Sequence, residues 1–175
     1  MIENIHERRL AANPEVVGGL LDSLASEDDR LWPHRRWPPM RFDNGLALGS
    51  RGGHGPVRYE VARYEPGRLV AFRFAPEFGI YGEHRCELID GPADTTLLRH
   101  TLEGRPTGWM RLGWPLVFRP LHDALIEDAF DRAEAQVKGE RWAPSSLPSH
   151  VRLLRWMLTR AAAPSRGRAR PRPAG

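Results

Sequence analysis

Two histidines flank a predicted hairpin turn, and both are expected on the same side of a sheet. His84 and His100 lie in two segments that alternate apolar and polar residues, on either side of a Gly-Pro-Ala turn at residues 91–93. Pairing Asp90 with Asp94 places His84 opposite His100. A register shift of two residues would make them diagonal neighbours on the same face. The spacing therefore predicts that the two imidazoles share the inward face of the hairpin.

Two further polar side chains are predicted on that side. His122 lies on the apolar stripe of a helical segment, and Tyr59 lies on the apolar face of an earlier strand. A few convergent polar groups in an apolar pocket are typical of a small-ligand site. Because imidazole titrates near neutral pH, His84, His100 and His122 are also the candidate catalytic acids or bases. The alternative is that each is a hydrogen-bonded core residue.

Metal, cofactor and nucleophile chemistry are not expected. His84, His100 and His122 lack the close ligand spacing of zinc motifs, so neither a metal nor a cofactor is predicted. Cys86 is the only cysteine, which excludes a disulfide within the chain, and it stands among apolar residues. The glycine-rich segment 49–56 lacks the lysine and the following helix of a phosphate loop. We expect a mobile loop between strands there, with His54 facing solvent, and the alternative is that His54 contacts a ligand at the mouth of a cavity.

Capping residues predict the N-terminal elements. Residues 2–12 are expected to form a strand. Asn13 followed by Pro14 indicates the N-cap and first turn of a helix, and apolar residues then recur at helical spacing. Ser26 predicts the cap of a second short helix, residues 27–32, whose acidic side chains suit its N-terminal end.

Antiparallel strands and one long helix are predicted for most of the remaining chain. Residues 57–64 and 69–75 alternate around a turn, and the histidine hairpin follows. Such a sheet needs a cover on its apolar face, which residues 108–137 supply as a helix that is regular from about Pro120. The apolar stripe of this helix holds His122, Ile126, Ala129, Phe130, Ala133 and Val137, and its outer face holds Asp123, Glu127, Asp128, Asp131 and Glu134.

This order of elements resembles the helix-grip fold of the START-like superfamily, which includes polyketide cyclases and lipid-transfer domains. The resemblance covers residues 2 to about 138 and rests on the segments NPEVVGGLLDSL and GPADTTLLRHTLEG and on the closing helix. It implies an α+β fold with two short helices after the first strand and a curved antiparallel sheet wrapped around the long helix. It also implies a cavity between sheet and helix. The expected apolar walls are Val70, Phe72, Phe74, Leu98, Ile126 and Phe130, and the expected polar contacts are Tyr59, His84, His100 and His122.

Three functions stay open at this point: the resemblance implies the first two, and the basic C-terminal segment suggests the third. The first is binding of a small hydrophobic or aromatic molecule such as a lipid, an isoprenoid or a polyketide. The second is a polyketide aromatase or cyclase that uses histidine or tyrosine for enolisation or dehydration. The third is a module without catalytic activity that interacts with a protein or a membrane through its C-terminal segment.

The charge of the chain is divided between an acidic body and a basic tail. Residues 141–175 hold eight of the 26 basic residues and no acidic one, so residues 1–140 carry 18 basic and 22 acidic groups, a net charge of −4. The tail is predicted to contain an amphipathic helix at about 148–163 and a disordered end rich in arginine and proline. An anionic membrane or a protein is its expected partner, and nucleic acid is not expected.

The sequence predicts a cytoplasmic protein, with peripheral membrane association left open. The N-terminal residues lack the apolar run of a signal peptide. No apolar stretch reaches the length of about 18 residues that a spanning helix requires.

Overall fold

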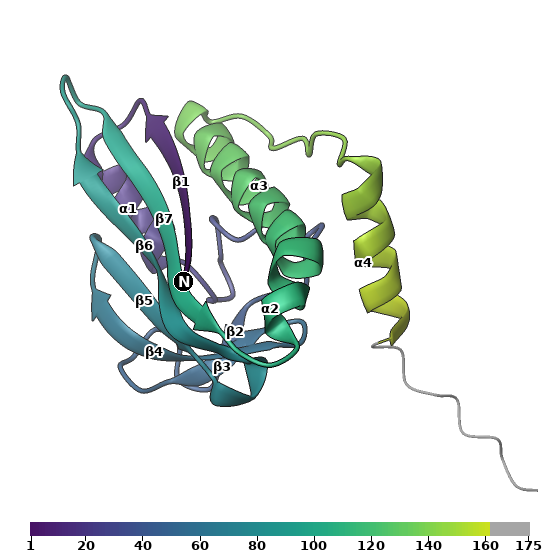
Figure 1. Cartoon of the computed structure of the whole chain (residues 1–175). Helices are drawn as coiled ribbons and strands as arrows, with labels where there is room; N and C mark the ends of the chain where they lie inside the picture. The colour runs from purple at the N-terminus through teal and green to yellow at the C-terminus, as the bar shows by residue number, and fades with distance from the viewer. Residues whose placement is uncertain (162–175) are drawn as a thin grey trace, which may run out of the picture.

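The computed structural model describes residues 1–161, in which one seven-stranded sheet curves around a long helix (Figure 1). The strand order is β1-β7-β6-β5-β4-β3-β2, and every neighbouring pair is antiparallel. The strands are β1 (Ile2–Leu10), β2 (Arg41–Phe42), β3 (Arg51–His54), β4 (Val57–Glu65), β5 (Leu69–Phe74), β6 (Ile80–Asp90) and β7 (Thr96–Pro106). The helices are α1 (Pro14–Asp22), η1 (Pro76–Phe78), α2 (Met110–Gly113), η2 (Trp114–Phe118), α3 (Arg119–Lys138) and α4 (Ser149–Ala161). This is the predicted α+β helix-grip architecture.

Helix α1 begins where its capping residues predict. The Asn13 side chain accepts a hydrogen bond from the backbone N–H of Val16 at 3.0 Å, and Pro14 occupies the first helical position. The apolar side of the helix is buried in the core through Val17, Leu20 and Leu21.

The second short helix predicted at residues 27–32 does not form, and turns replace it. The carboxylate of Asp29 accepts hydrogen bonds from the backbone N–H groups of Ala25, Leu31 and Trp32, at 2.8, 2.9 and 2.7 Å. Such side-chain bonds to the local backbone compete with helix formation. One short helix, not two, therefore follows β1.

The hairpin of β6 and β7 has the predicted inward face but a different register. Asp90 pairs with Thr96, so Cys86 lies opposite His100 and His84 lies opposite Leu102. The loop contains five residues rather than three, and two of them, at 93 and 94, have positive φ angles of 51° and 56°. The predicted opposition of His84 and His100 is therefore wrong by two residues. The two are diagonal neighbours, and both are buried.

Segment 49–56, expected to be a loop, contains strand β3 between β2 and β4. Its glycines allow close approach, since a Cβ atom at Gly52 would lie 1.9 Å from the carbonyl oxygen of Arg41. His54, at the end of this strand, is only partly exposed, which corrects the expectation that it faces solvent.

The closing helix follows the prediction, with one exception. Regular α3 begins at Arg119 and ends at Lys138, and its C-cap Gly139 has a φ angle of 67°. Its apolar stripe faces the core, as expected: Ile126, Ala129, Phe130 and Ala133 are buried, and His122 and Val137 are partly buried. Asp128, predicted on the outer face, is buried with 2% of its surface exposed.

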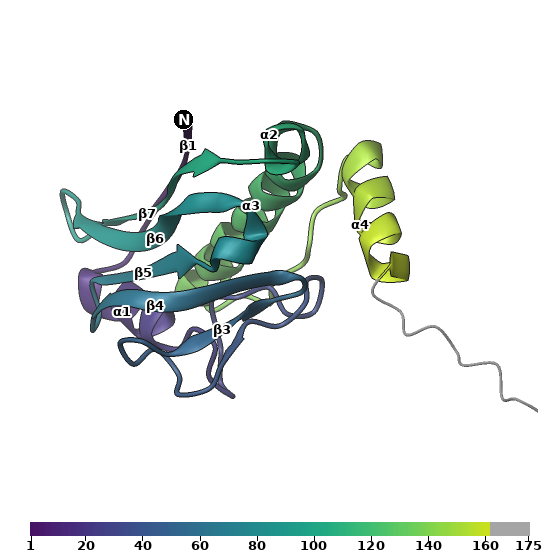
Figure 2. The same ribbon diagram turned by 60° about the horizontal axis from the view of Figure 1, so that its bottom comes forward.

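Helix α4 lies on the α3 side of the molecule, beyond an extended connection (Figures 1 and 2). Val151 is buried, and Leu154 and Leu158 pack against the core. The guanidinium of Arg155 lies over the Trp37 ring, 4.7 Å from its centroid. The predicted arginine- and proline-rich end lies outside the described residues.

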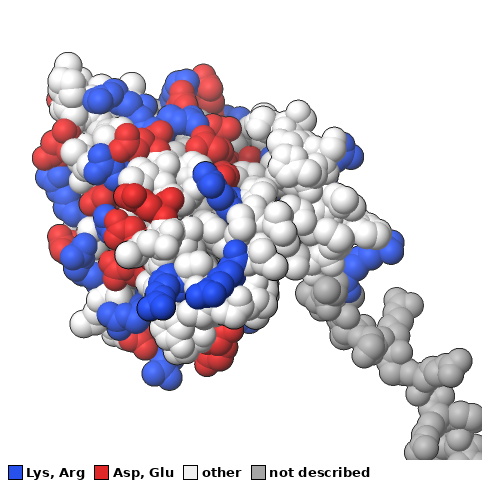
Figure 3. All heavy atoms as spheres, viewed as in Figure 1, with Lys and Arg blue, Asp and Glu red and all other residues white. Residues whose placement is uncertain are grey.

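Charged side chains are distributed unevenly over the surface. Acidic and basic residues intermingle over the sheet, whereas the surface near α2 and α4 carries few of them (Figure 3). The exposed large apolar residues there are Trp109, Leu112, Leu116, Leu153, Trp156 and Met157. Within residues 1–161 no helix combines the length and the apolar character needed to cross a bilayer.

Candidate functional site

A cavity of about 820 Å³ lies between the inner face of the sheet and α3. Its volume falls within the usual range for small-molecule sites, and its walls are mainly aliphatic and aromatic. Eight of the ten predicted ligand-binding residues line it: Tyr59, Phe72, Phe74, His84, His100, His122, Ile126 and Phe130.

The other two predicted wall residues, Val70 and Leu98, do not line the cavity. Both are almost completely buried and belong to the packed core. Helix α1 contacts β6 and β7, and β7 carries Leu98. Alternation along a strand predicted which way these side chains point, but it could not predict where packed core gives way to open space.

Five of the seven histidines lie with Tyr59 in one row of aromatic rings. Neighbouring ring centroids are 4.7 to 5.9 Å apart, distances typical of aromatic contacts. The order of the row is His54, Tyr59, His84, His100, His122 and His6. The three predicted catalytic candidates are consecutive members of this row.

The two hairpin histidines form a hydrogen bond inside the core. His84 Nδ1 lies 3.2 Å from His100 Nε2, so one ring donates and the other accepts. The remaining nitrogens, His84 Nε2 and His100 Nδ1, are buried without a hydrogen-bond partner among the described residues. Both rings line the cavity, and each unpaired buried group costs about 1–3 kcal/mol.

Burial holds the cavity histidines in their neutral form. It lowers the pKa of His84 and of His100 well below the usual value of 6.5, and the charge of a protonated His122 would lower both further. Burial lowers the pKa of His54 to about 3 and also lowers the pKa of His122. At neutral pH these rings therefore act as hydrogen-bond donors and acceptors rather than as charged acids.

Several cavity residues lie outside the set predicted from the sequence. His54 contacts Trp32, with ring centroids 4.7 Å apart, and both line the cavity. Trp37 and Trp114 also contribute to its wall. The available signal for the tryptophans was their position beside prolines or at element ends, which ordinary packing explains equally well.

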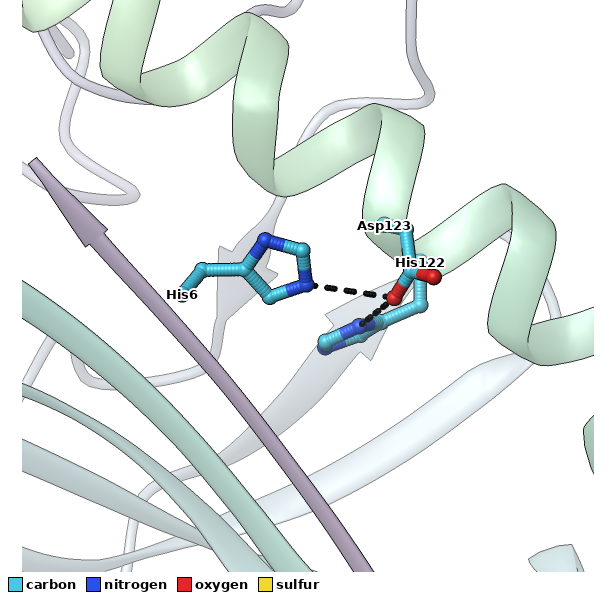
Figure 4. Close-up of side chains that lie close together, drawn as sticks. All are labelled: His6, His122 and Asp123. Carbon is cyan, nitrogen blue, oxygen red and sulfur yellow. Dashed lines mark hydrogen bonds and ion pairs between the residues drawn. The ribbon is translucent and has the colours of Figure 1, made fainter.

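A second polar cluster lies next to the cavity, where β1 passes α3 (Figure 4). His6 Nε2 lies 3.1 Å from Asp123 Oδ1, and His6 Nδ1 lies 2.7 Å from Glu127 Oε1. His122 Nδ1 lies 3.7 Å from the same Asp123 oxygen, longer than a hydrogen bond. Asn4 Nδ2 donates to this oxygen at 3.0 Å. No local pattern marks this cluster in the sequence, because polar residues occupy both faces of β1.

This cluster shifts the pKa values of its members in opposite directions. The hydrogen bond to Asp123 raises the pKa of His6, and Glu127 adds to this effect against the opposing influence of burial. Burial alone would raise the pKa of Asp123, but contacts with His122, His6 and Asn4 outweigh it and lower that pKa. His6 is therefore the member of the histidine row that favours the charged form.

Comparison with known proteins gives similarity in structure but not in sequence. No family model matches the chain, and no curated protein matches it. Among solved structures, CalU16 from Micromonospora echinospora aligns with a TM-score of 0.57 and 17% identity, over 92% of this chain and 86% of that one. A conserved protein of unknown function from Enterococcus faecalis aligns with a TM-score of 0.59 and 15% identity, over 90% and 85%.

A third similar structure is a point mutant of norcoclaurine synthase from Thalictrum flavum in complex with a transition-state analogue. It aligns with a TM-score of 0.56 and 14% identity, over 78% of this chain and 97% of that one. Identities this low concern the fold alone. The chain thus shares with these proteins an antiparallel sheet closed by a C-terminal helix.

Proposed function

We propose that this protein binds a small hydrophobic or aromatic molecule in the cavity between the sheet and α3. The observation that carries the proposal is an apolar cavity of about 820 Å³ whose wall includes the rings of His84 and His100, each with one buried nitrogen that has no hydrogen-bond partner among the described residues. A lipid, isoprenoid or polyketide with one or two polar atoms has the matching chemistry. The START-like resemblance and the ligand-bound structure of the similar norcoclaurine synthase support this proposal.

The polar anchors are His84 and His100, with Tyr59 beside them. Their neutral rings offer a donor and an acceptor in a region shielded from water, where a hydrogen bond to a guest adds to apolar burial. A hydroxyl or carbonyl group on an aromatic guest would complete this network.

A pair of matched probes tests the anchors. Naphthalene and 2-naphthol differ by one hydroxyl, so a ring nitrogen that binds this hydroxyl should make 2-naphthol bind about tenfold more tightly, equivalent to ~1.4 kcal/mol. His100→Leu should reduce this ratio toward one, whereas His150→Leu, at an exposed residue of α4, should leave it unchanged. An unchanged ratio in both His84→Leu and His100→Leu would remove these residues from the site.

The second candidate function is an enzyme of the polyketide aromatase or cyclase kind. The direct hydrogen bond between His84 and His100, with Tyr59 at 4.7 Å from His84 between ring centroids, favours it. Because burial keeps the imidazoles neutral, such an enzyme would use them to orient and polarise a carbonyl rather than as imidazolium acids. This mechanism would be contradicted if turnover required a protonated group with a pKa near 6.5 and if His84→Leu abolished that turnover.

A further inference from the structure

The cluster between β1 and α3 brings together two imidazoles and one carboxylate. His6, His122 and Asp123 each offer one donor atom, and these three atoms lie within 4.8 Å of one another. Two of the separations are 3.1 Å, between His6 Nε2 and Asp123 Oδ1, and 3.7 Å, between His122 Nδ1 and the same oxygen. Donors in a tetrahedral shell of ~2.0–2.2 Å bonds lie about 3.3–3.6 Å apart, so these two separations are within a few tenths of an ångström of the required range.

Two side chains at this place have buried polar atoms that lack a hydrogen-bond partner among the described residues. Both ring nitrogens of His122 are buried without a hydrogen-bond partner among the described residues. Asn4, only 8% exposed, donates to Asp123 through Nδ2, but its Oδ1 atom is also buried and unpartnered. Buried polar groups are nearly always paired, and a cation bound beside Asp123 would pair one of the His122 ring nitrogens.

The surroundings also supply the outer contact that metal-binding histidines commonly have. The second nitrogen of His6, Nδ1, lies 2.7 Å from Glu127 Oε1, which fixes the ring with Nε2 toward Asp123 and His122. A carboxylate behind a ligating imidazole orients the ring and raises its basicity. Glu127 is itself held by Arg8 at 3.0 Å.

We propose that His6, His122 and Asp123 bind a divalent first-row transition metal ion. Two imidazoles and one carboxylate suit Zn²⁺ or Fe²⁺, whereas Mg²⁺ and Ca²⁺ prefer oxygen donors alone. The ion takes the place of the proton shared between His6 Nε2 and Asp123 Oδ1. Three protein ligands leave at least one coordination position for water or another small ligand.

One nearby cation opposes this assignment. Arg119 Nε lies 3.7 Å from Asp123, but its contact is with Oδ2, and its side chain is 58% exposed. The other carboxylate oxygen, Oδ1, stays directed at the two histidines. A screened surface charge of this kind weakens binding only moderately.

The site stands apart from the proposed guest-binding function, although His122 belongs to both. His122 lines the cavity, whereas His6 and Asp123 do not. Failure of metal binding would therefore leave the cavity proposal intact, and failure to bind apolar probes would leave the metal proposal intact.

Calorimetric titration of ZnCl₂ into the full chain, without a histidine tag and after chelator treatment, tests the proposal. We expect one ion per chain with micromolar or lower Kd, and tetrahedral visible absorption when Co²⁺ replaces Zn²⁺. His122→Gln and Asp123→Asn should each weaken binding at least a hundredfold, and Glu127→Gln, which leaves all three ligands in place, about tenfold. His150→Gln, at an exposed histidine outside both the cluster and the cavity, should change nothing.

Three outcomes would overturn the assignment. The first is Zn²⁺ binding weaker than millimolar, and the second is Zn²⁺ binding that neither His122→Gln nor Asp123→Asn weakens. The third is loss of Zn²⁺ binding in His84→Gln, which would place the ion on the hairpin histidines. Circular dichroism verifies the fold of each variant. If a ligand variant does not fold, Glu127→Gln decides alone, because Glu127 is exposed and its replacement should retain the fold while weakening Zn²⁺ binding. Unchanged affinity in Glu127→Gln would then contradict the proposal.

Discussion

The indole nitrogen of Trp37 donates a 2.7 Å hydrogen bond to Asp128 Oδ2, linking the proline-rich segment after α1 to the middle of α3. Arg36 Nη1 contacts both oxygens of the same carboxylate, at 2.9 and 3.0 Å. Arg36 also donates to the carbonyl of Ser145, and Arg155 donates to the carbonyl of Arg36. Asp128 therefore joins three parts of the chain beside the cavity wall.

Replacing Asp128 with alanine should lower the free energy of unfolding by about 3 kcal/mol. The change leaves the Arg36 guanidinium, only 16% exposed, and a buried indole N–H without their acceptor. Asp131→Ala, which removes the more exposed contact with Arg8 from the same helix, should cost about 1 kcal/mol or less. Urea denaturation of both variants measures the difference, and equal losses would show that the Asp128 network adds no specific stability.

Two adjacent glycines of α1 should respond to alanine in opposite ways. A Cβ atom at Gly18 would lie 2.7 Å from the carbonyl oxygen of Gly67, so Gly18→Ala should lower the free energy of unfolding by about 1–3 kcal/mol. At Gly19 the nearest atom to a Cβ atom would be the flexible end of Arg30 at 3.7 Å. Gly19→Ala should therefore raise the free energy of unfolding by up to ~1 kcal/mol. Thermal unfolding of the pair checks the signs, and the same sign for both would contradict the packing of α1 against the β4–β5 turn.

The stability of the protein should fall in mild acid because buried imidazoles resist protonation. Burial lowers the pKa of His84 well below 6.5, and His54, His100, His122 and Tyr59 face it without supplying an anion. Below about pH 6.5 the His84 imidazole is protonated in the unfolded chain but stays neutral in the folded chain. Each such group then costs up to about 1.4 kcal/mol per pH unit, until the folded pKa is reached.

His84→Gln should therefore flatten the dependence of stability on pH. Between pH 6 and 5 the loss of unfolding free energy should be about 1 kcal/mol smaller in His84→Gln than in the original protein. His150→Gln, on the exposed surface of α4, serves as the control. Parallel curves for all three proteins would mean that His84 titrates normally in the fold.

The basic C-terminal segment should bind anionic vesicles. Helix α4 buries Val151 against the domain and leaves Leu153 and Trp156 about half exposed, at 56% and 50%. With eight arginines and no acid after residue 140, we expect cosedimentation with vesicles containing phosphatidylserine but not with neutral ones, and release by 0.5 M salt. Removal of residues 162–175 should weaken this binding, and equal sedimentation with both vesicle types would argue against electrostatic docking.

Local signals predicted the elements well, whereas features set by distant segments escaped prediction. Asn13 and Pro14 fixed the start of α1, and alternation fixed the inward faces of β4 to β7. The hairpin register depended on two loop residues with positive φ angles, which alternation cannot reveal. Asp128 reads as an outward acid on a helical wheel, because the segments that bury it come from elsewhere in the chain.

The candidate site was predicted only in part, because some of its residues are brought together by distant segments of the chain. Strand periodicity placed His84 and His100 correctly inside, and helical periodicity placed His122. His6 was missed, and His54 was expected to face solvent with ligand contact only as the alternative, since their contacts depend on which strands pair and on how the sheet curves around α3. Phe72 lines the cavity and Val70 does not, although both point inward from β5. How far the cavity extends along a strand depends on tertiary packing and leaves no local signal in the sequence.

Titration with the neutral apolar fluorophore N-phenyl-1-naphthylamine tests the hollow interior most directly. We expect enhanced emission with one probe bound per chain. Ala129→Trp, which fills the cavity from α3, should bind the probe at least tenfold more weakly. Gln136→Trp, on the exposed face of the same helix, should bind it with unchanged affinity. Ala129→Trp should keep the thermal stability of the original protein or exceed it. Equal probe affinity in Ala129→Trp and Gln136→Trp would contradict a guest-binding cavity at this place.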